Sequence, residues 1–338
     1  MNKKNIRAIA AAVVMGTLVA GSTVSAAQAA GSTDIQVGVI AINSMGAVQY
    51  AQDSGIFKKN KINVSQFVTF PAPPPGLAAL NSGAVQFMYA PTIPVLNSVY
   101  NGGLKLKIVA AADGYLPSDV AAGLSDPAFA SKLDDTGACV GKNSGITRWK
   151  QLEGKTVAVP ARGAQGEVTI SAAVKKDGGD PAKINWVTLS FPEVTAAVTK
   201  GTVDAGFTVE PFTTECAASN TMLPAPGVQF FTNGGAIGVW VTTADFAKSK
   251  PNVVKAFQKA IYTANKAGMA PATLNAVVKS SLKITLQTFV AAKAATPTYY
   301  PPTVRVAEVQ TVADKMTSLG FLKSAVKVSS LILPQPSK

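Results

Sequence analysis

The sequence predicts an α/β protein built from two similar lobes, and three observations support this prediction. First, one phrase occurs twice, as AALNSGAVQFMYAP from Ala78 and as AAVTKGTVDAGFTVEP from Ala196. In each copy a helical segment ends at a glycine, Gly83 or Gly201, and a short strand follows. Second, strand-like and helix-like segments alternate, which predicts parallel pairing. Third, 338 residues exceed the ~250–300 at which a single core stops growing, so two lobes are expected.

Each half of the chain gives its elements in the same order. The strands are rich in β-branched residues, and the helices carry apolar residues at helical spacing and end near glycine. The first half reads as strand DIQVGVIAI, helix AVQYAQDSGIF, strand INVSQFVTF, helix PPPGLAALNSG, strand AVQFMYA and strand LKLKIVAAA. The second half reads as strand KTVAVP, helix QGEVTISAAVKKDG, strand INWVTLS, helix EVTAAVTKG and strand TVDAGFTV, and then VQFFTNGGAIGVWVTT as further strand.

The rest of the chain sets the expected domain boundaries. The segment from Asp245 onward reads as mostly helical and is expected to pack on the first lobe. Lobe 1 would then be discontinuous, and two chain crossings near residues 115–119 and 224–227 would form a hinge. The expected division is a signal peptide at 1–30, lobe 1 at 31–118 and 225–338, and lobe 2 at 119–224.

The N-terminus and the cysteines indicate export. Lys3, Lys4 and Arg7 precede an apolar run and then an Ala-Gln-Ala cleavage site, the pattern of a secretory signal peptide. Since no cysteine lies near that site, a lipid anchor is not expected. The product should be soluble, in the periplasm or on the outer face of the cytoplasmic membrane. The two cysteines, Cys139 and Cys216, are expected to form a disulfide there, the alternative being two separately buried thiols.

Charge and histidine content exclude other functions. The formal net charge is +13, but much of it lies from Asp245 onward, where 13 basic and 3 acidic residues are spread along helix-like segments. Because no basic stripe or nucleic-acid motif occurs, no nucleic-acid partner is expected. The chain has no histidine, which excludes Ser-His and Cys-His nucleophile pairs and histidine metal sites. No GxGxxG or phosphate-loop motif is present, so no cofactor and no metal are expected.

At this point the chain resembles the solute-binding proteins of ABC importers, in the group for sulfonates, nitrate and thiamine-precursor pyrimidines. The resemblance is carried, in the family's order, by YAQDSGIFKKNKINV, AALNSGAV, LKLKIVAAA, NSGITRWKQLEGKTVAVP and GTVDAGFTVEP. It implies the type II periplasmic-binding fold. One departure is Gln86, which stands in the first repeat where the family often has an acidic residue, as the second repeat has in Asp204.

Ligands of open α/β sheets bind beyond the carboxyl ends of the strands, and this rule selects the candidate site residues. Arg162 stands just before a helix start and is expected to bind an anionic group, the alternative being an ion pair with Glu193 or another acid. Phe191 is either an aromatic wall or core, and Glu210 is either a ligand contact, a latch between lobes or a carboxylate fixing a strand end. The full set of expected ligand-binding residues is Asn43, Ser44, Met45, Gly76, Tyr89, Ala90, Thr92, Tyr115, Arg162, Gly163, Ala164, Phe191 and Glu210.

These observations predict an exported solute receptor, monomeric and without enzymatic activity. Its two lobes would close over a small anionic or heteroaromatic molecule of sulfonate, carboxylate or pyrimidine type and deliver it to an ABC permease. Two alternatives stay open: an enzyme of the same fold acting on a small organic acid, and a ligand sensor that docks a signalling receptor.

Overall fold

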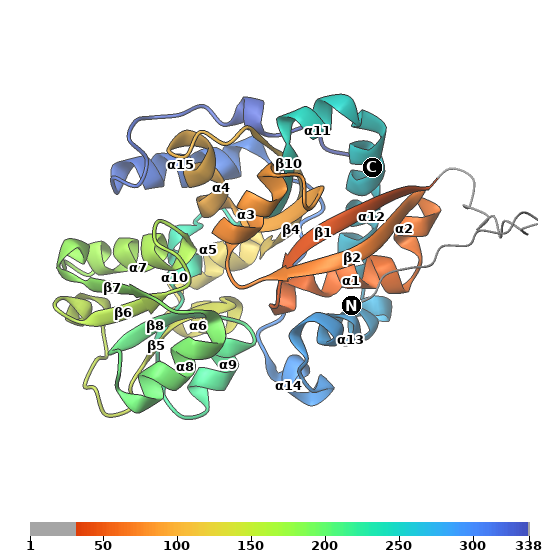
Figure 1. Cartoon of the computed structure of the whole chain (residues 1–338). Coiled ribbons are helices and arrows are strands. Elements are labelled where there is room, and N and C mark those ends of the chain that lie inside the picture. Colours follow the sequence, from red (N-terminus) through yellow and green to blue (C-terminus); the bar gives the residue numbers. More distant parts are fainter. Residues whose placement is uncertain (1–31, 337–338) are drawn as a thin grey trace, which may run out of the picture.

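The computed structural model describes residues 32–336, so the expected signal peptide lies outside the described residues. Two five-stranded sheets form the cores of two lobes that lie side by side (Figure 1). Their strand orders are β2-β1-β3-β10-β4 and β7-β6-β8-β5-β9. The two orders are the same when β1, β2 and β3 are matched with β6, β7 and β8. The predicted α/β fold with two similar lobes is therefore confirmed.

The first sheet contains β1 (Thr33–Ile40), β2 (Ile62–Phe70), β3 (Phe87–Pro91), β4 (Leu106–Tyr115) and β10 (Gly235–Thr243). Its early helices are α1 (Gly46–Asp53), α2 (Ile56–Lys59), α3 (Pro73–Asn81) and α4 (Thr92–Tyr100), with the short helix η1 (Asn43–Met45) before α1. Proline stands in the first turn of α3, where its missing N–H costs no helical hydrogen bond.

The second sheet contains β5 (Thr136–Val140), β6 (Thr156–Val159), β7 (Asn185–Thr188), β8 (Ala205–Val209) and β9 (Thr221–Pro224). Its helices are α7 (Gln165–Lys176), α8 (Phe191–Lys200) and α9 (Phe212–Ala217), with the short helices η2 (Trp149–Leu152) and η3 (Pro181–Lys183). A disulfide joins Cys139 on β5 to Cys216 on α9, as the sequence predicted. Both cysteines are fully buried, so the bond crosslinks the interior of this lobe.

The repeated phrase occupies the same place in both lobes. It forms α3 and β3 in one and α8 and β8 in the other, and Gly83 and Gly201 have φ angles of +82° and +71°. Gln86 Oε1 accepts a hydrogen bond from the Gln36 N–H at 2.8 Å, and Asp204 Oδ2 accepts one from the Thr156 N–H at 2.8 Å. A glutamine therefore performs in the first lobe the strand-joining role that an aspartate performs in the second.

Two strands run against the predicted parallel direction. β10 is antiparallel to β3 and β4, and β5 is antiparallel to β8 and β9. Each of them is the first strand that the chain forms after crossing from the other lobe, so no βαβ crossover within its own sheet fixes its direction. Strands β5 and β9 were not predicted from the sequence, and residues 228–230, predicted as strand, form the end of α10 (Pro226–Phe230).

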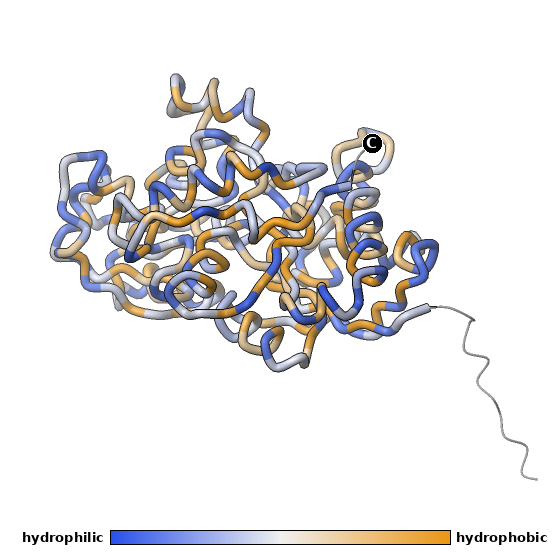
Figure 2. The backbone as a smooth tube through the Cα atoms, turned by 90° about the horizontal axis from the view of Figure 1, so that it is seen from above, coloured by the Kyte–Doolittle hydropathy of each residue, from blue (hydrophilic) through white to orange (hydrophobic). Residues whose placement is uncertain are grey.

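The C-terminal helices pack on the first lobe, as predicted. They are α11 (Ala244–Ser249), α12 (Pro251–Met269), α13 (Pro271–Thr285), α14 (Phe289–Ala294) and α15 (Val306–Ser318), with the short helix η4 (Ser329–Leu331). Phe257 of α12 stacks on Phe87 of β3, with ring centroids 3.8 Å apart, and on Phe57 of α2 at 5.8 Å. Figure 2 shows polar and apolar residues alternating along the helices, as expected of helices with one face on a core.

The chain crosses between the lobes twice. The first crossing follows β4 and leads through α5 (Pro117–Ser125) and α6 (Pro127–Leu133) to β5. The second runs from β9 through α10 to β10, and α10 packs against α7 and β5 of the second lobe. We therefore infer that this crossing lies at 231–235, a few residues after the expected boundary at 224–227. Among residues 32–336, no helix combines the length and the apolar character that a membrane crossing requires.

Candidate functional site

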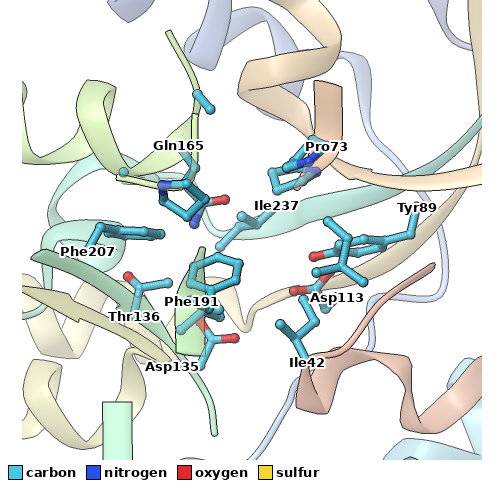
Figure 3. A pocket seen from close by; sticks show the side chains of 16 residues that line it. Ile42, Pro73, Tyr89, Asp113, Asp135, Thr136, Gln165, Phe191, Phe207 and Ile237 are labelled. Atoms are coloured by element: carbon cyan, nitrogen blue, oxygen red, sulfur yellow. The ribbon is translucent and has the colours of Figure 1, made fainter. Parts of the chain in front are cut away.

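A pocket lies between the two lobes, at the strand ends where a ligand was expected (Figure 3). About 530 Å³ between its lining residues is free of atoms, part of it continuous with solvent. The first lobe contributes Ile40, Ile42, Pro73, Tyr89, Pro91, Asp113 and Ile237. The second lobe contributes Asp135, Thr136, Pro160, Ala164, Gln165, Gly166, Phe191, Phe207 and Val209. Because both sheets supply the walls, a bound molecule would touch both lobes.

Asp113 is the buried acid of the first lobe. It lies near the end of β4 with 6% of its surface exposed. Its Oδ2 accepts a hydrogen bond from the Ser44 hydroxyl at 2.9 Å, whereas its Oδ1 has no hydrogen-bond partner among the described residues. Burial raises the pKa of Asp113 to about 6, because the charged form loses hydration. Opposite it, Gly238 leaves space, since a Cβ there would lie 1.8 Å from Asp113 Oδ1.

Asp135 is the acid of the second lobe, just before β5. Its Oδ1 accepts a hydrogen bond from the Tyr115 hydroxyl at 3.3 Å. Burial raises the pKa of Asp135 well above its usual range, and the carboxyl groups of Asp113, Asp134 and Glu210 raise it further. Figure 3 shows Asp113 and Asp135 on the same side of the pocket, opposite Gln165 and Pro73. The pocket thus has one acidic side.

The opposite side holds the N-terminus of α7. Ala164, Gln165 and Gly166 line the pocket there, and no side chain caps this helix. The first N–H groups of a helix have no partners within it, and the helix dipole adds a partial positive charge. This side can therefore accept a negatively charged group or a hydrogen-bond acceptor of a ligand.

Aromatic rings form much of the remaining wall. Tyr89 and Phe207 lie on opposite sides of the pocket in Figure 3. Phe191 is stacked on Phe212, with centroids 5.8 Å apart and the planes within 8° of each other. Such rings favour a ligand with a flat or apolar body. Among the described residues that line this pocket, none is lysine or arginine.

Three of the predicted binding residues line the pocket: Tyr89, Ala164 and Phe191. Ser44 lies behind the wall, where its hydroxyl binds Asp113. Asn43 is buried next to a different hollow, between α13 and the segment 292–300, and its Oδ1 has no hydrogen-bond partner among the described residues.

Four others belong to the core of the first lobe. Met45 and Ala90 are fully buried. Thr92 is buried as well, and its hydroxyl donates to the Ile237 carbonyl at 2.8 Å. Gly76 gives α3 room to pack on β3, because a Cβ there would lie 2.1 Å from Met88 Cε. These residues support the site from behind without lining it.

Tyr115 lies at the first crossing, also outside the pocket lining. Its hydroxyl binds Asp134, whose Oδ1 also accepts from the Thr136 N–H at 2.9 Å and whose Oδ2 accepts from the Val228 N–H at 2.7 Å. Burial raises the pKa of Tyr115 well above its usual range. The residue therefore fixes the junction between the lobes next to Asp135.

Arg162 lies outside the pocket, and its contact is the ion pair weighed as the alternative. Its Nε and Nη2 donate to Glu167 at 3.0 and 2.8 Å, and its side chain is 57% exposed beside another surface groove. The acid is Glu167 and not Glu193, which instead accepts from Ser190 at the start of α8. Gly163, with φ +64°, donates its N–H to the same Glu167 at 2.6 Å. The positive charge that was expected to face a ligand is therefore paired with Glu167 of the same segment.

Glu210 connects the lobes. It is 2% exposed, and its Oε1 accepts from the Thr214 hydroxyl at 2.9 Å and from the Thr296 N–H at 3.1 Å. Thr214 is four residues away, whereas Thr296 belongs to the C-terminal part of the chain. The Glu210 carbonyl also accepts from the Asn43 N–H at 3.1 Å. Both the strand-end role and the latch role considered for Glu210 agree with these contacts.

Asp113 and Asp135 line the pocket but were not among the residues predicted from the sequence. Asp113 stands alone in the apolar strand VAAADGY, and a buried charge at a strand end was the available signal. Asp135 immediately precedes β5. Because the sequence did not predict this strand, the expectation that ligands bind at strand ends did not select Asp135. Most of the other missed residues are apolar, and nothing in their local sequence separates a pocket wall from a core.

Comparisons with known proteins agree with this geometry. Residues 134–271 match the family model described as NMT1/THI5 like. A taurine-binding periplasmic protein of Escherichia coli (strain K12) is 30% identical over 138 residues, which is 41% of this chain and 42% of that protein's length.

Solved structures share the fold over nearly the whole chain. The alkanesulfonate-binding protein of Xanthomonas axonopodis pv. citri has a TM-score of 0.70 and 19% identity, covering 90% of this chain and 99% of its own. The nitrate-binding protein of Synechocystis PCC 6803 has a TM-score of 0.72 and 14% identity, covering 89% of this chain and 86% of its own. A desulfurization enzyme has the fold as well, with a TM-score of 0.61 and 13% identity, covering 89% of this chain and 96% of its own. The resemblance expected from the sequence is thereby confirmed, and so is the fold.

Proposed function

We propose that this chain is an exported solute-binding protein that holds a small organic molecule between its lobes and delivers it to an ABC importer. The observation that supports this most directly is the pocket whose walls come from the strand ends of both sheets. A ligand that touches both lobes stabilises the closed form, and this difference in affinity is all that capture requires. The importer as the partner is supported by the periplasmic binding proteins that share the fold.

The ligand we propose is a small molecule with a flat or apolar body and an anionic or acceptor group. The aromatic walls would cover the body, and the uncapped start of α7 would receive the acceptor group. The proteins named above for sulfonate and taurine binding support a sulfonate as such a group. Arg162 has no part in this proposal, because it pairs with Glu167.

The proposal is tested by thermal shift and by calorimetry with a panel of sulfonates, aromatic carboxylates and pyrimidines. A molecule that binds only the native state raises the melting temperature. Phe191→Ala should weaken binding about tenfold or more, because it removes a pocket wall. Phe129→Ala is the matched control, since Phe129 is 37% exposed on α6 and does not line the pocket. Equal loss in both variants would contradict the assignment of the pocket.

One observation keeps an enzyme as a second candidate. Two carboxyl groups with raised pKa values lie in one pocket, which is an arrangement that acid/base catalysts use, and an enzyme shares the fold. Mass spectrometry of the bound molecule after prolonged incubation separates the two. We expect it to be recovered intact, whereas conversion to a product would favour the enzyme.

A further inference from the structure

The two carboxyl groups that line the acidic side of the pocket form no ion pair with any described residue. Four carboxyl groups lie at or just behind it, and two of them are fully engaged. Asp134 accepts from Tyr115, Thr136 and Val228, and Glu210 accepts from Thr214 and Thr296. The other two, Asp113 and Asp135, line the pocket itself.

Of these two carboxyl groups, Asp113 has a buried oxygen atom without a hydrogen-bond partner among the described residues. Only 6% of the Asp113 surface is exposed, and Figure 3 shows the side chain at the pocket wall. Its Oδ1 lacks a hydrogen-bond partner among residues 32–336. A buried carboxylate oxygen without a partner is costly, so such groups normally meet a donor or a positive charge. The Tyr89 hydroxyl lies close to the Asp113 carboxyl and partly offsets the effect of burial on its pKa, but it forms no hydrogen bond of full geometry to Oδ1. Gly238 leaves free the space beside this oxygen that a side chain would fill.

No described residue that lines the pocket offers a positive charge to these carboxyl groups. None of the described lining residues is basic, and the chain has no histidine. Within the described part of the chain, no group of three or more His, Cys, Asp or Glu residues is placed to hold a metal ion. An organic nitrogen cation fits better, because it can donate several hydrogen bonds to two carboxylates and also lie against the aromatic rings of Tyr89 and Phe191.

We propose that the ligand carries a positively charged nitrogen, an ammonium or amidinium, which binds between Asp113 and Asp135. This inference rests on the proposed function and narrows its ligand class. With an acceptor group at the start of α7 on the opposite side, the pocket suits a dipolar molecule that has its positive end at the two carboxylates. A simple anion would leave both of them unpaired.

The titratable groups around the two carboxylates give the proposal a pH signature. Asp113 and Asp135 face each other, and the charge of Asp113 raises the pKa of Asp135. Asp113 also faces Tyr89 and Tyr300, and Asp135 faces Tyr115 and the acids Asp134 and Glu210. With a pKa of about 6 in the ligand-free protein, Asp113 is mostly protonated at pH 5 and mostly ionised at pH 7. A ligand that stays cationic throughout should therefore bind about tenfold more tightly at pH 7 than at pH 5, because it needs the ionised carboxylate.

The experiment is calorimetry on the full chain with two matched pairs: taurine against ethanesulfonate, and benzamidine against benzamide. In each pair only the first member carries the cationic nitrogen. We expect the cationic member to bind at least tenfold more tightly at pH 7.5. Asp113→Asn and Asp135→Asn should each remove most of that preference. Asp314→Asn, at an exposed position on α15, should leave it unchanged. Circular dichroism shows that each variant is folded.

The outcomes separate this inference from the proposed function. If the uncharged or purely anionic member of a pair binds as tightly as the cationic one, the inference is wrong while solute binding stands. If none of the four binds, the molecule released from the denatured protein decides, and one without a basic nitrogen overturns the inference. If none binds and no small molecule is released, both the inference and the proposed function are contradicted.

Discussion

At the scale of single residues, Asp113 is a buried carboxyl group that lowers the stability of the folded protein. The carboxyl group is buried in a mostly apolar pocket with one oxygen unpaired. Its pKa is raised to about 6 by burial, so the ligand-free folded state disfavours the charged form. Under the proposal that Asp113 binds a ligand, this carboxyl lowers the stability of the ligand-free protein in exchange for binding.

This cost leads to a prediction for Asp113→Asn. Since the folded pKa exceeds the unfolded value of 3.8, stability falls as pH rises from about 4 to 6, and the penalty is complete above pH 6. The free energy of unfolding of the variant should be up to about 3 kcal/mol higher than that of the unmodified protein at pH 7.5, and the two values should converge near pH 4. Urea unfolding of ligand-free protein at both pH values measures this. If the difference in unfolding free energy between the two proteins were the same at both pH values, the charge of Asp113 would not be its cause.

At the scale of elements, the two lobes are stabilised differently. The first lobe stacks Phe57, Phe87 and Phe257 in one aromatic cluster and receives the C-terminal helices. The second lobe instead has a disulfide between β5, an inner strand of its sheet, and α9. The bond closes a loop with a sequence separation of 77 residues that includes β6, β7 and β8.

Removal of this disulfide should therefore destabilise the second lobe. For Cys139→Ala with Cys216→Ala we expect a loss of about 2–5 kcal/mol, because the crosslink restricts a long loop in the unfolded chain. Alanine avoids placing new polar atoms at two fully buried positions. Urea unfolding followed by tryptophan fluorescence reports it, and reduction should lower the stability of the unmodified protein but not that of the variant. Equal urea midpoints for the unmodified protein and the double variant would show that packing alone stabilises this lobe.

At the scale of the whole molecule, the lobes touch through a few polar contacts around the pocket. Asn97 on α4 donates to the Gly163 carbonyl at 3.1 Å, and Thr296 and Asn43 donate to Glu210. Under the proposed function the lobes close over a ligand, and these contacts form when the lobes are close together. They contribute to the closed form without touching a ligand, so they should set affinity from outside the pocket.

Asn97→Ala tests this expectation. Loss of one interlobe hydrogen bond should shift the equilibrium toward the open form and weaken ligand binding by about two- to tenfold, corresponding to roughly 0.5–1.5 kcal/mol. Calorimetry with a ligand identified in the panel gives the change. Asn63→Ala is the control, because Asn63 donates to Asp34 within the first sheet, away from the pocket. A similar loss in both variants would argue against a closure effect.

The repeated phrase, the alternation of elements and the two cysteines determined much from the sequence alone. Helix stops at glycine and strands of β-branched residues are local features, so α3, β3, α8 and β8 could be located without a structure. Site residues were harder to predict, because a residue that follows a strand can either line the pocket or lie in the core. Met45 and Thr92 stand at such ends and are buried, whereas Phe191 stands at one and lines the pocket.

The sequence by itself determined the fold class, the pairing of Cys139 with Cys216 and the region where a pocket forms, because each depends on local pattern or on simple counting. Only the tertiary structure decided which charge faces that pocket. The sequence predicted that Arg162 binds the ligand, whereas in the structure Arg162 forms an ion pair with Glu167. Asp113 and Asp135 lie 22 positions apart in the sequence and in different lobes, and only the folded chain brings them to one pocket. Electrostatic character at a site is set by distances between residues remote in sequence, and folding alone fixes those distances.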